Sequence, residues 1–317
     1  MTPDELILKI VTEIKVSKKE AATIIEKAVA GGETDVKNLE EWYTKRFKPN
    51  LVFIKKDDYA RMCIDALKIL GKTAATDYGG SRQRDLAQLW ADMTRGYLGE
   101  QAIVQFLKEK FNIDSEFDHS KGDLKDYIQM DIKKVLISNK WREPKLKIGI
   151  KTTKWNGIWF DIPGAQFHHS DINVLVKIGA SREHLFTFFK EISVFKDKIL
   201  KIGVEVGSLT EKEAKDLYDE LPSFQPITAY ITGFVTKDVP FRDLDYGGKT
   251  GRLNFTITSW KGPIKPGDLD KIKLQNKISG KVTFLGIGSF SHDAGYLFNT
   301  GTLHWKKEDW EKLIKML

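Results

Sequence analysis

The sequence predicts a mixed α/β (α+β) protein in which helices flank a mixed central sheet, with a helical module before this core and a β-rich region after it. Two observations predict this class. Apolar residues recur at helical spacing over most of the first 111 residues, whereas from Tyr127 onward they alternate or form short continuous runs, as strands do. An order of helices, then mixed sheet, then further strands is typical of an α/β or α+β core with appendages.

The length of 317 residues suffices for two or three domains. Pro49 and Asn50 form a turn signal that marks the first boundary. We expect an N-terminal helical module at 1–50, a core at 51–240 and a β-rich C-terminal region at 241–317.

The composition is that of a folded, soluble protein, with 41% hydrophobic and 30% charged residues. No run of 18 apolar residues is present, so no membrane-spanning helix is expected. Asp4 and Glu5 stand where a secretion signal would carry basic residues. The single cysteine, Cys63, excludes an internal disulfide framework and a thiolate cluster for zinc. We therefore expect a cytoplasmic protein.

Basic residues are unevenly distributed along the chain. The formal net charge is +7, and residues 121–154 alone hold ten basic residues against four acidic ones, a net +6. An evenly basic surface would serve solubility, whereas a local excess of this size indicates a polyanionic partner, most simply a nucleic acid.

The first third of the chain predicts helices. Apolar residues at helical spacing begin at Leu6, and Ser17 with Glu20 forms a capping box that opens a second helix. Further helices are expected at residues 36–47, 57–70, 82–111, 210–221 and 305–317. Gly96 and Gly99 interrupt the longest of these. They predict either close approach of another backbone or a ligand, or a break between two helices, since each glycine costs a helix about 1 kcal/mol relative to alanine.

From residue 127 the hydrophobic period changes to that of strands. The continuous apolar run at 172–178 predicts a strand buried on both faces. The expected strands are at residues 127–137, 146–153, 158–162, 172–178, 227–235, 253–258 and 282–287. Residues 185–195 continue the β-rich pattern, with a short helix as the alternative.

An acid and a lysine on neighbouring strands point to metal-dependent hydrolysis of a phosphodiester. Such a reaction needs a divalent cation to activate water and neutralise charge. Mg²⁺ takes one or two carboxylates, and a lysine beside it can orient the attacking water or stabilise the charged phosphorane. Asp131 and Lys151 lie within successive predicted strands and can project from one face. Asp123 or Asp126 is the alternative to Asp131.

Over roughly residues 85–240 the chain resembles the PD-(D/E)XK nucleases, especially type II restriction endonucleases. The family pattern is a helix with a glutamate, a strand with an aspartate and a strand carrying (D/E)-X-K. Glu100, in Gly-Tyr-Leu-Gly-Glu-Gln-Ala, matches the glutamate. Asp131 matches the aspartate and Lys151 the final lysine. The resemblance implies a restriction-endonuclease-like fold and Mg²⁺-dependent DNA hydrolysis, with these three residues as catalytic residues.

Gly149 departs from the family pattern, which has Asp or Glu two residues before the lysine. Glycine has no side chain to bind a metal. We expect the missing carboxylate to come from Glu100 or, second, from Asp161 at the end of the next strand. With Asp131, these are the candidate metal ligands. The alternative is an altered, catalytically inactive site.

Basic residues around the cluster are candidates for DNA contact, through phosphates or through base edges. They lie in the basic region, beside the helix that carries Glu100, and in the C-terminal loops: Lys133, Lys134, Lys147, Lys154, Arg82, Arg84, Arg95, Lys249, Arg252 and Lys261. His168 and His169 have no partner cluster at metal-ligand spacing, so we expect them to contact DNA or solvent.

The sequence therefore predicts a Mg²⁺-dependent double-stranded DNA endonuclease, most simply a sequence-specific type II restriction enzyme. A palindromic target would make it a homodimer. The alternatives are a structure-specific repair or recombination nuclease, and a non-catalytic nucleic-acid-binding protein, which Gly149 favours.

Overall fold

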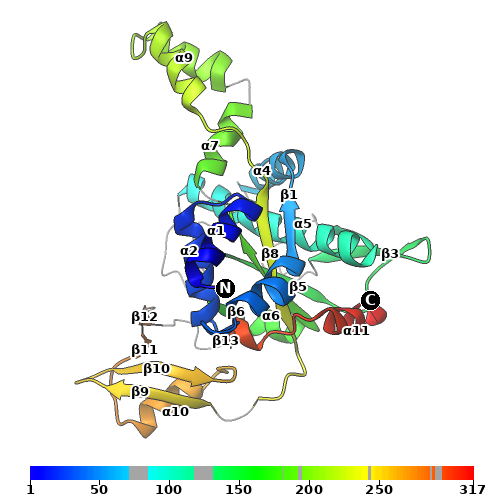
Figure 1. The fold of residues 1–317 in the computed structure, drawn as a ribbon, viewed down its shortest axis with the longest axis vertical. Coiled ribbons are helices and arrows are strands. Elements are labelled where there is room, and N and C mark those ends of the chain that lie inside the picture. The colour runs from blue at the N-terminus through cyan, green and yellow to red at the C-terminus, as the bar shows by residue number, and fades with distance from the viewer. Residues whose placement is uncertain are drawn as a thin grey trace.

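The computed structural model describes residues 1–70, 85–117, 131–180, 182–191, 195–241, 244–285, 288–289 and 295–317. Helices surround a central sheet, and three further sheets lie at its periphery (Figure 1). The predicted mixed α/β class is confirmed at this level. Within the described ranges, no helix is long and apolar enough to cross a membrane.

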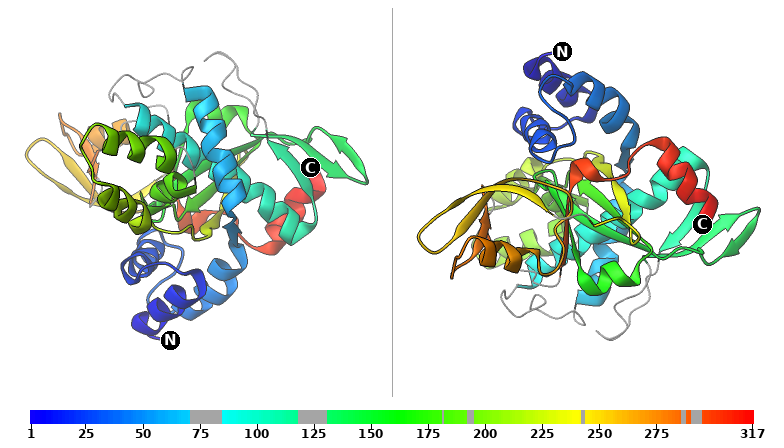
Figure 2. Two further views of the ribbon diagram at one scale, coloured as in Figure 1. Left: turned by 90° about the horizontal axis from the view of Figure 1, so that it is seen from above. Right: turned by 90° about the horizontal axis from the view of Figure 1, so that it is seen from below.

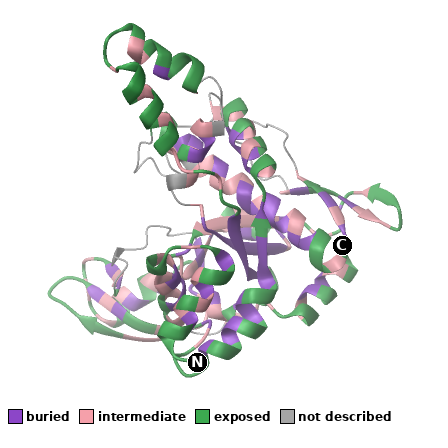
Figure 3. Cartoon of the chain, turned by 45° about the horizontal axis from the view of Figure 1, so that its top comes forward, coloured by how far each residue is buried: buried purple, intermediate pink, exposed green. Residues whose placement is uncertain are grey.

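The central sheet has the strand order β1, β8, β7, β5. Its members are β1 (Leu51–Ile54), β8 (Ile227–Thr236), β7 (Ile172–Ile178) and β5 (Ile148–Lys154). Strands β5 and β7 are parallel, whereas β8 is antiparallel to both β7 and β1. Every residue of β7 is buried, as its apolar run predicts, and Figure 3 shows the buried residues concentrated in this sheet.

Two helices, α4 (Lys56–Leu70) and α5 (Leu86–Phe111), pack against one face of this sheet (Figure 2). Helix α5 begins at Asp85, whose carboxylate caps it by accepting the Gln88 N–H at 2.8 Å. It continues unbroken to residue 111, so a break between two helices at the glycines is wrong. The other alternative, close approach, is correct at Gly99.

Gly99 is the point at which α5 contacts strand β5 most closely. A Cβ at position 99 would lie 1.9 Å from Thr152 Oγ1, whereas a Cβ at Gly96 would meet nothing within 4 Å. The Thr152 hydroxyl donates to the Gly96 carbonyl at 3.4 Å. The missing side chain at 99 therefore sets the distance between α5 and β5.

We expect Gly99→Ala to destabilise the protein by about 1–3 kcal/mol, because the added methyl overpacks the contact with Thr152. Gly96→Ala is the matched control and is expected to stabilise by up to about 1 kcal/mol, since it adds helix propensity without a clash. Urea unfolding of both variants measures this. Equal stabilisation by both substitutions would contradict the close contact.

The N-terminal helices α1 (Pro3–Ile14) and α2 (Lys18–Ala30) each begin with a capping box. The third predicted segment is a short α3 (Leu39–Glu41), a π-helical turn at Trp42–Phe47 and a 3-10 turn at Lys48–Asn50. These helices share one hydrophobic core with Trp155 and Tyr230 of the sheet region. The boundary at residue 50 stays a prediction.

Three small sheets surround the core. The first contains β2 (Asp114–Phe117), β3 (Ile132–Ile137) and β4 (Lys140–Arg142), the second β6 (Trp159–Pro163) and β13 (Gly295–Asn299), and the third β9 (Asp245–Thr250), β10 (Phe255–Lys261), β11 (Val282–Phe284) and β12 (Gly288–Ser289). The remaining helical elements here are α6 (Gly164–His169), α10 (Asp268–Gln275), a 3-10 turn at Thr300–Thr302 and α11 (Lys307–Met316). Residues 127–130 of one predicted strand lie outside the described residues.

The strand expected at 185–195 is wrong, and the alternative of a helix is correct. Helix α7 (Arg182–Glu191) occupies most of this range. Its aromatic residues have strand propensity, but Phe188 packs in the main core and against Trp90, and this tertiary contact overrides propensity. Helices α8 (Lys201–Glu205) and α9 (Glu211–Glu220) follow a π-helical turn at Phe195–Leu200 and extend away from the core, at the top of Figure 1.

Candidate functional site

Lys151 lies in the middle of β5, the edge strand of the central sheet as described. Successive residues of a strand face opposite sides. Ile148 and Ile150 belong to the core beneath α5, so Lys151 faces the other way. Burial lowers the pKa of the Lys151 ammonium, whereas the charges of Asp131 and Asp161 act to raise it. Both acids therefore lie within electrostatic reach of the lysine.

Asp131 directly precedes β3 and is hydrogen-bonded to the first residues of β5. Its backbone N–H donates to the Ile148 carbonyl at 3.1 Å, and its carboxylate accepts the Ile150 N–H. These two bonds fix the carboxylate beside the strand that carries Lys151. The prediction that Asp131 lies within a strand is wrong, because Asp131 precedes β3, and β3 pairs with β2 and β4 rather than with β5. Its position near the strand of Lys151 comes from the two hydrogen bonds to β5.

Asp161 reaches the same lysine from strand β6. Its neighbours Phe160 and Ile162 are fully buried in a separate core, and Asp161 faces the opposite side by the alternation of the strand. In register it pairs with Leu297 of β13, more than a hundred residues later in the chain. The position of Asp161, the second candidate for the missing carboxylate, thus depends on the pairing of β6 with β13, which the sequence pattern did not predict.

Glu100 lies on α5, one residue after Gly99. Helix α5 covers the face of the sheet that Ile148 and Thr152 line, which is opposite to the face of Lys151. The acids whose charges act on the Lys151 pKa are Asp131 and Asp161. The charge of Asp161 thus acts on Lys151, and the roles of Asp161 and of Glu100 as the replacement carboxylate both stay predictions.

The structure gives a reason for glycine at position 149. A Cβ there would lie 2.8 Å from Ser170 Oγ and 2.9 Å from Asn173 Oδ1. Asn173 is opposite Gly149 in the parallel register of β5 and β7, and it is 1% exposed. The amide of Asn173 and the hydroxyl of Ser170 thus occupy the space into which an acidic side chain at 149 would extend. Neither residue was among those predicted.

Two carboxylates beside a lysine suit Mg²⁺, which commonly takes one or two carboxylates and completes its shell with water and substrate phosphate. Asp131 and Asp161 are two carboxylates whose charges act on Lys151. No group of three or more His, Cys, Asp or Glu residues that could hold a metal occurs in the part of the chain that the structure describes. Burial raises the pKa of the Cys63 thiol to about 11, so it offers no thiolate at neutral pH. Asp123 and Asp126 lie outside the described residues.

The predicted DNA-contacting residues near the cluster are exposed. Lys147 precedes β5 and Lys154 ends it, while Lys133 and Lys134 lie on β3. Arg95 is less accessible and pairs with Asp92 at 3.0 Å on α5. These positive charges lie on elements that adjoin Lys151.

The predicted contacts in the C-terminal region lie elsewhere. Lys249 and Arg252 are exposed on the hairpin of β9 and β10, and Lys261 ends β10. This sheet and the β3–β4 hairpin project from opposite sides of the molecule (Figure 1). A short segment of DNA that contacts the lysines near Lys151 would therefore not reach the basic residues of this C-terminal sheet. Arg82 and Arg84 lie outside the described residues.

The His168–Asp171 segment makes protein contacts. His168 Nε2 lies 3.2 Å from the Tyr296 hydroxyl. The Asp171 carboxylate accepts hydrogen bonds from the Lys147 N–H at 2.9 Å and from the Lys237 ammonium. These two bonds link the ends of β5, β7 and β8. The pKa of His169 is lowered by partial burial and by Lys147. These contacts give the segment a structural role.

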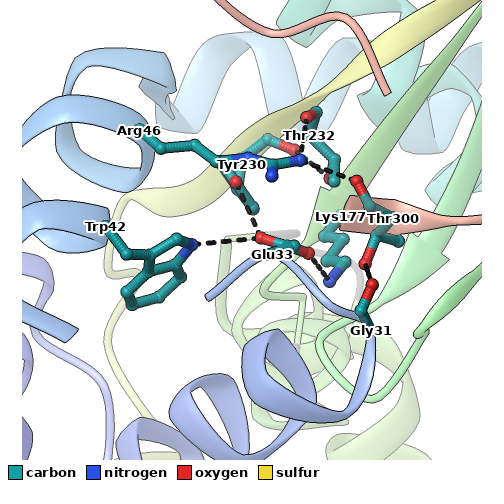
Figure 4. A network of polar contacts seen from close by, with 8 residues as sticks. All are labelled: Gly31, Glu33, Trp42, Arg46, Lys177, Tyr230, Thr232 and Thr300. Carbon is teal, nitrogen blue, oxygen red and sulfur yellow. Dashed lines mark hydrogen bonds and ion pairs between the residues drawn. The ribbon is translucent and has the colours of Figure 1, made fainter. Parts of the chain in front are cut away.

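A buried polar network, absent from the sequence predictions, joins the N-terminal helices to the sheet (Figure 4). Glu33 accepts from Lys177 at 2.7 Å, from the Tyr230 hydroxyl at 2.9 Å and from Trp42 Nε1 at 3.2 Å. Arg46 donates to the Thr300 carbonyl at 2.7 Å. A glutamate in a Gly-Gly-Glu loop carries no pattern that signals burial, so only the packing reveals it.

Comparisons with protein-family models, with curated proteins and with solved structures found no match. The assignment of a function therefore rests on the geometry and charge of the residues themselves.

Proposed function

We propose that this protein is a Mg²⁺-dependent endonuclease of double-stranded DNA, of the type II restriction kind. The observation that carries the proposal is the cluster on β5, an edge strand of the central sheet, in which a partly buried Lys151 lies within electrostatic reach of Asp131 and Asp161. A restriction-endonuclease-like core is part of this proposal. Its supports are the parallel pairing of β5 with β7 and the position of Asp131 at the start of β5.

The proposed chemistry assigns one task to each residue. Asp131 and Asp161 hold the cation, which when bound neutralises charge on the phosphate and activates water. Lys151 lies beside them and orients the attacking water or balances the charge that develops on the phosphate oxygens. Burial lowers the pKa of Lys151, which also brings its neutral amine closer to physiological pH than that of a surface lysine.

Basic side chains provide the supporting charge for DNA. Lys147 and Lys154 are exposed at the two ends of β5, and Lys133 and Lys134 are exposed on β3. Such contacts to phosphates give affinity that falls as salt rises. The third sheet, with Lys249 and Arg252 on its hairpin, is the candidate reader of sequence, and a palindromic target would require a homodimer.

A non-catalytic DNA-binding protein is the second candidate, and one observation favours it. The space beside Gly149, where the family pattern places an acid, is filled by Ser170 and Asn173. In that case the basic surface would bind DNA, and the cluster of Lys151 with two acids would be a structural ion group.

A plasmid assay with Mg²⁺ separates these functions. We expect cleavage to discrete bands, and we expect Asp131→Asn and Asp161→Asn each to reduce the rate at least a hundredfold, because each removes a charge that holds the cation. Glu100→Gln is the matched comparison and is expected to have a smaller effect, since Glu100 lies on the helix that covers the other face. DNA affinity, measured separately with Ca²⁺ in place of Mg²⁺, should persist in all three variants.

The alternatives have distinct results in the same assay. Cleavage of branched DNA alone would indicate a structure-specific nuclease. Binding without cleavage by the unsubstituted protein would establish the non-catalytic function and refute the proposal.

A further inference from the structure

A cavity of about 460 Å³ lies beyond the carboxyl ends of the parallel strands β5 and β7. Lys154 to Asn156 follow one strand and Ile178 to Ala180 the other, and helices α2, α4, α5 and α7 supply the remaining wall. Its volume falls within the range of about 300–1,000 Å³ of small-molecule sites. In open α/β sheets, ligands bind outside the carboxyl ends of the strands.

The wall contains buried hydrogen-bond donors that lack partners. Trp155 is 7% exposed, and its indole Nε1 has no acceptor among the described residues. That nitrogen lies against Gly179, which also lines the cavity, since a Cβ at 179 would be 2.7 Å from it. Arg95 Nε is likewise buried with no acceptor in the described part of the chain. A buried donor without an acceptor costs about 1–3 kcal/mol, and both donors belong to residues that line the cavity.

The charge at the cavity favours an anion. Lys154 and Arg95 carry positive charge on its wall. Among the described residues of the lining, the acid is Glu20, whose carboxylate accepts the Ser17 N–H at 3.0 Å and the Ser17 hydroxyl at 2.8 Å in the capping box. Arg95 pairs through its terminal nitrogen with Asp92 at 3.0 Å, which compensates part of its charge. Lys154 is therefore the principal cation available to a ligand.

The rest of the wall is apolar and suits a flat organic group. Leu98 and Ile178 line the cavity from the main core and are 1% exposed. Ala91 and Ala180, which have small side chains, line it as well. The Tyr59 hydroxyl already donates to the His184 carbonyl at 2.7 Å, which fixes the ring at the wall. An anionic group near Lys154 and a planar body against these side chains would together fill the cavity.

We infer that this cavity binds a small organic phosphate of nucleotide size, with the phosphate at Lys154 and the ring system among the apolar residues. The inference goes beyond DNA cleavage and does not depend on it. Lys154 is three residues from Lys151 and, by the alternation of the strand, on the opposite face of β5. The ligand would thus bind close to the proposed cleavage site without occupying it.

Titration calorimetry with 5′-AMP tests the inference on the full chain. We expect saturable binding of AMP, and binding at least tenfold weaker for adenosine and for inorganic phosphate, because each lacks half of the required contacts. Lys154→Met should weaken AMP binding at least tenfold. Lys147→Met, an exposed lysine just before the same strand, is the matched control and should leave AMP binding unchanged.

Two further variants complete the test. Trp155→Phe removes the indole donor and is expected to weaken AMP binding several-fold, with circular dichroism used to verify that the variant is folded. Asp131→Asn should bind AMP as the unsubstituted protein does, which separates this site from the cleavage site. Absence of saturable AMP binding, equal affinity for adenosine, or unchanged AMP affinity in Lys154→Met would each overturn the inference.

Discussion

Lys151→Met is expected to reduce the rate of DNA cleavage by about 10²–10³-fold, the usual cost of removing one charge-stabilising donor from a hydrolytic site. Methionine preserves much of the length and apolar body of the partly buried lysine, so the fold should persist. The amine that Asp131 and Asp161 face is lost. Single-turnover cleavage with Mg²⁺ measures the rate, and a binding assay with Ca²⁺ is expected to show retained affinity.

Lys147→Met is the matched control for this substitution, because Lys147 is an exposed lysine directly before the same strand. It is expected to weaken DNA binding slightly and to reduce its salt dependence, without changing the rate at saturation. If Lys151→Met cleaved at the rate of the unsubstituted protein, the assignment of Lys151 to the reaction would be wrong.

The pH dependence of cleavage has a defined sign. Burial lowers the pKa of Lys151, although Asp131 and Asp161 act to raise it. If the neutral amine accepts a proton from the attacking water, the cleavage rate rises with pH until the lysine is deprotonated. We expect this rise in the unsubstituted protein and a flatter profile in Lys151→Met. A rate that falls over the same pH range would instead assign the lysine a purely electrostatic role.

Glu33→Ala is expected to lower the free energy of unfolding by about 3–5 kcal/mol, because it leaves the buried Lys177 without its counter-charge. The side chains of Glu33 and Lys177 are 0% and 4% exposed, at a separation of 2.7 Å. The substitution also removes the acceptor of Tyr230 and Trp42. Urea unfolding, followed by tryptophan fluorescence, measures the loss.

Glu41→Ala provides the matched control. Glu41 pairs with Lys45 at 3.0 Å, but both side chains are at least 60% exposed. The loss of this pair is expected to cost no more than about 1 kcal/mol, since water screens exposed pairs. Equal effects of the two substitutions would contradict the burial of the Glu33 network.

Stability in acid follows from the same carboxylate. Burial alone would raise the pKa of Glu33, but the charges of Lys177 and Arg46 and its hydrogen bonds outweigh burial and hold the pKa below its usual value of 4.5. A carboxylate with a lowered folded-state pKa contributes stability above its unfolded pKa and loses it as pH falls through the folded value. We expect the unfolding free energy of the unsubstituted protein to fall below about pH 4.5, and we expect a weaker fall in Glu33→Gln.

Local patterns predicted most of the elements. The continuous apolar run at 172–178 became β7 with the expected bounds, and the capping box at Ser17 opens α2. Such signals are carried by neighbouring residues and survive in any fold. The helix α7 was missed as a first choice because its aromatic residues have strand propensity, and the contact that fixes it as a helix lies across the core.

The sequence by itself predicted that Lys151 lies within a strand of a strongly basic region, because strand period and charge are local properties, whereas Asp131 lies just before β3 and not within the strand predicted for it. The tertiary structure alone decided which further acid lies near that lysine. Asp161 acts on its pKa from β6, which pairs with the distant β13, and the role of Glu100 on α5 stays a prediction. The reason for glycine at position 149 also came from the tertiary structure. Gly149 looks like a lost ligand in the sequence, but in the fold it is the place that Ser170 and Asn173 fill.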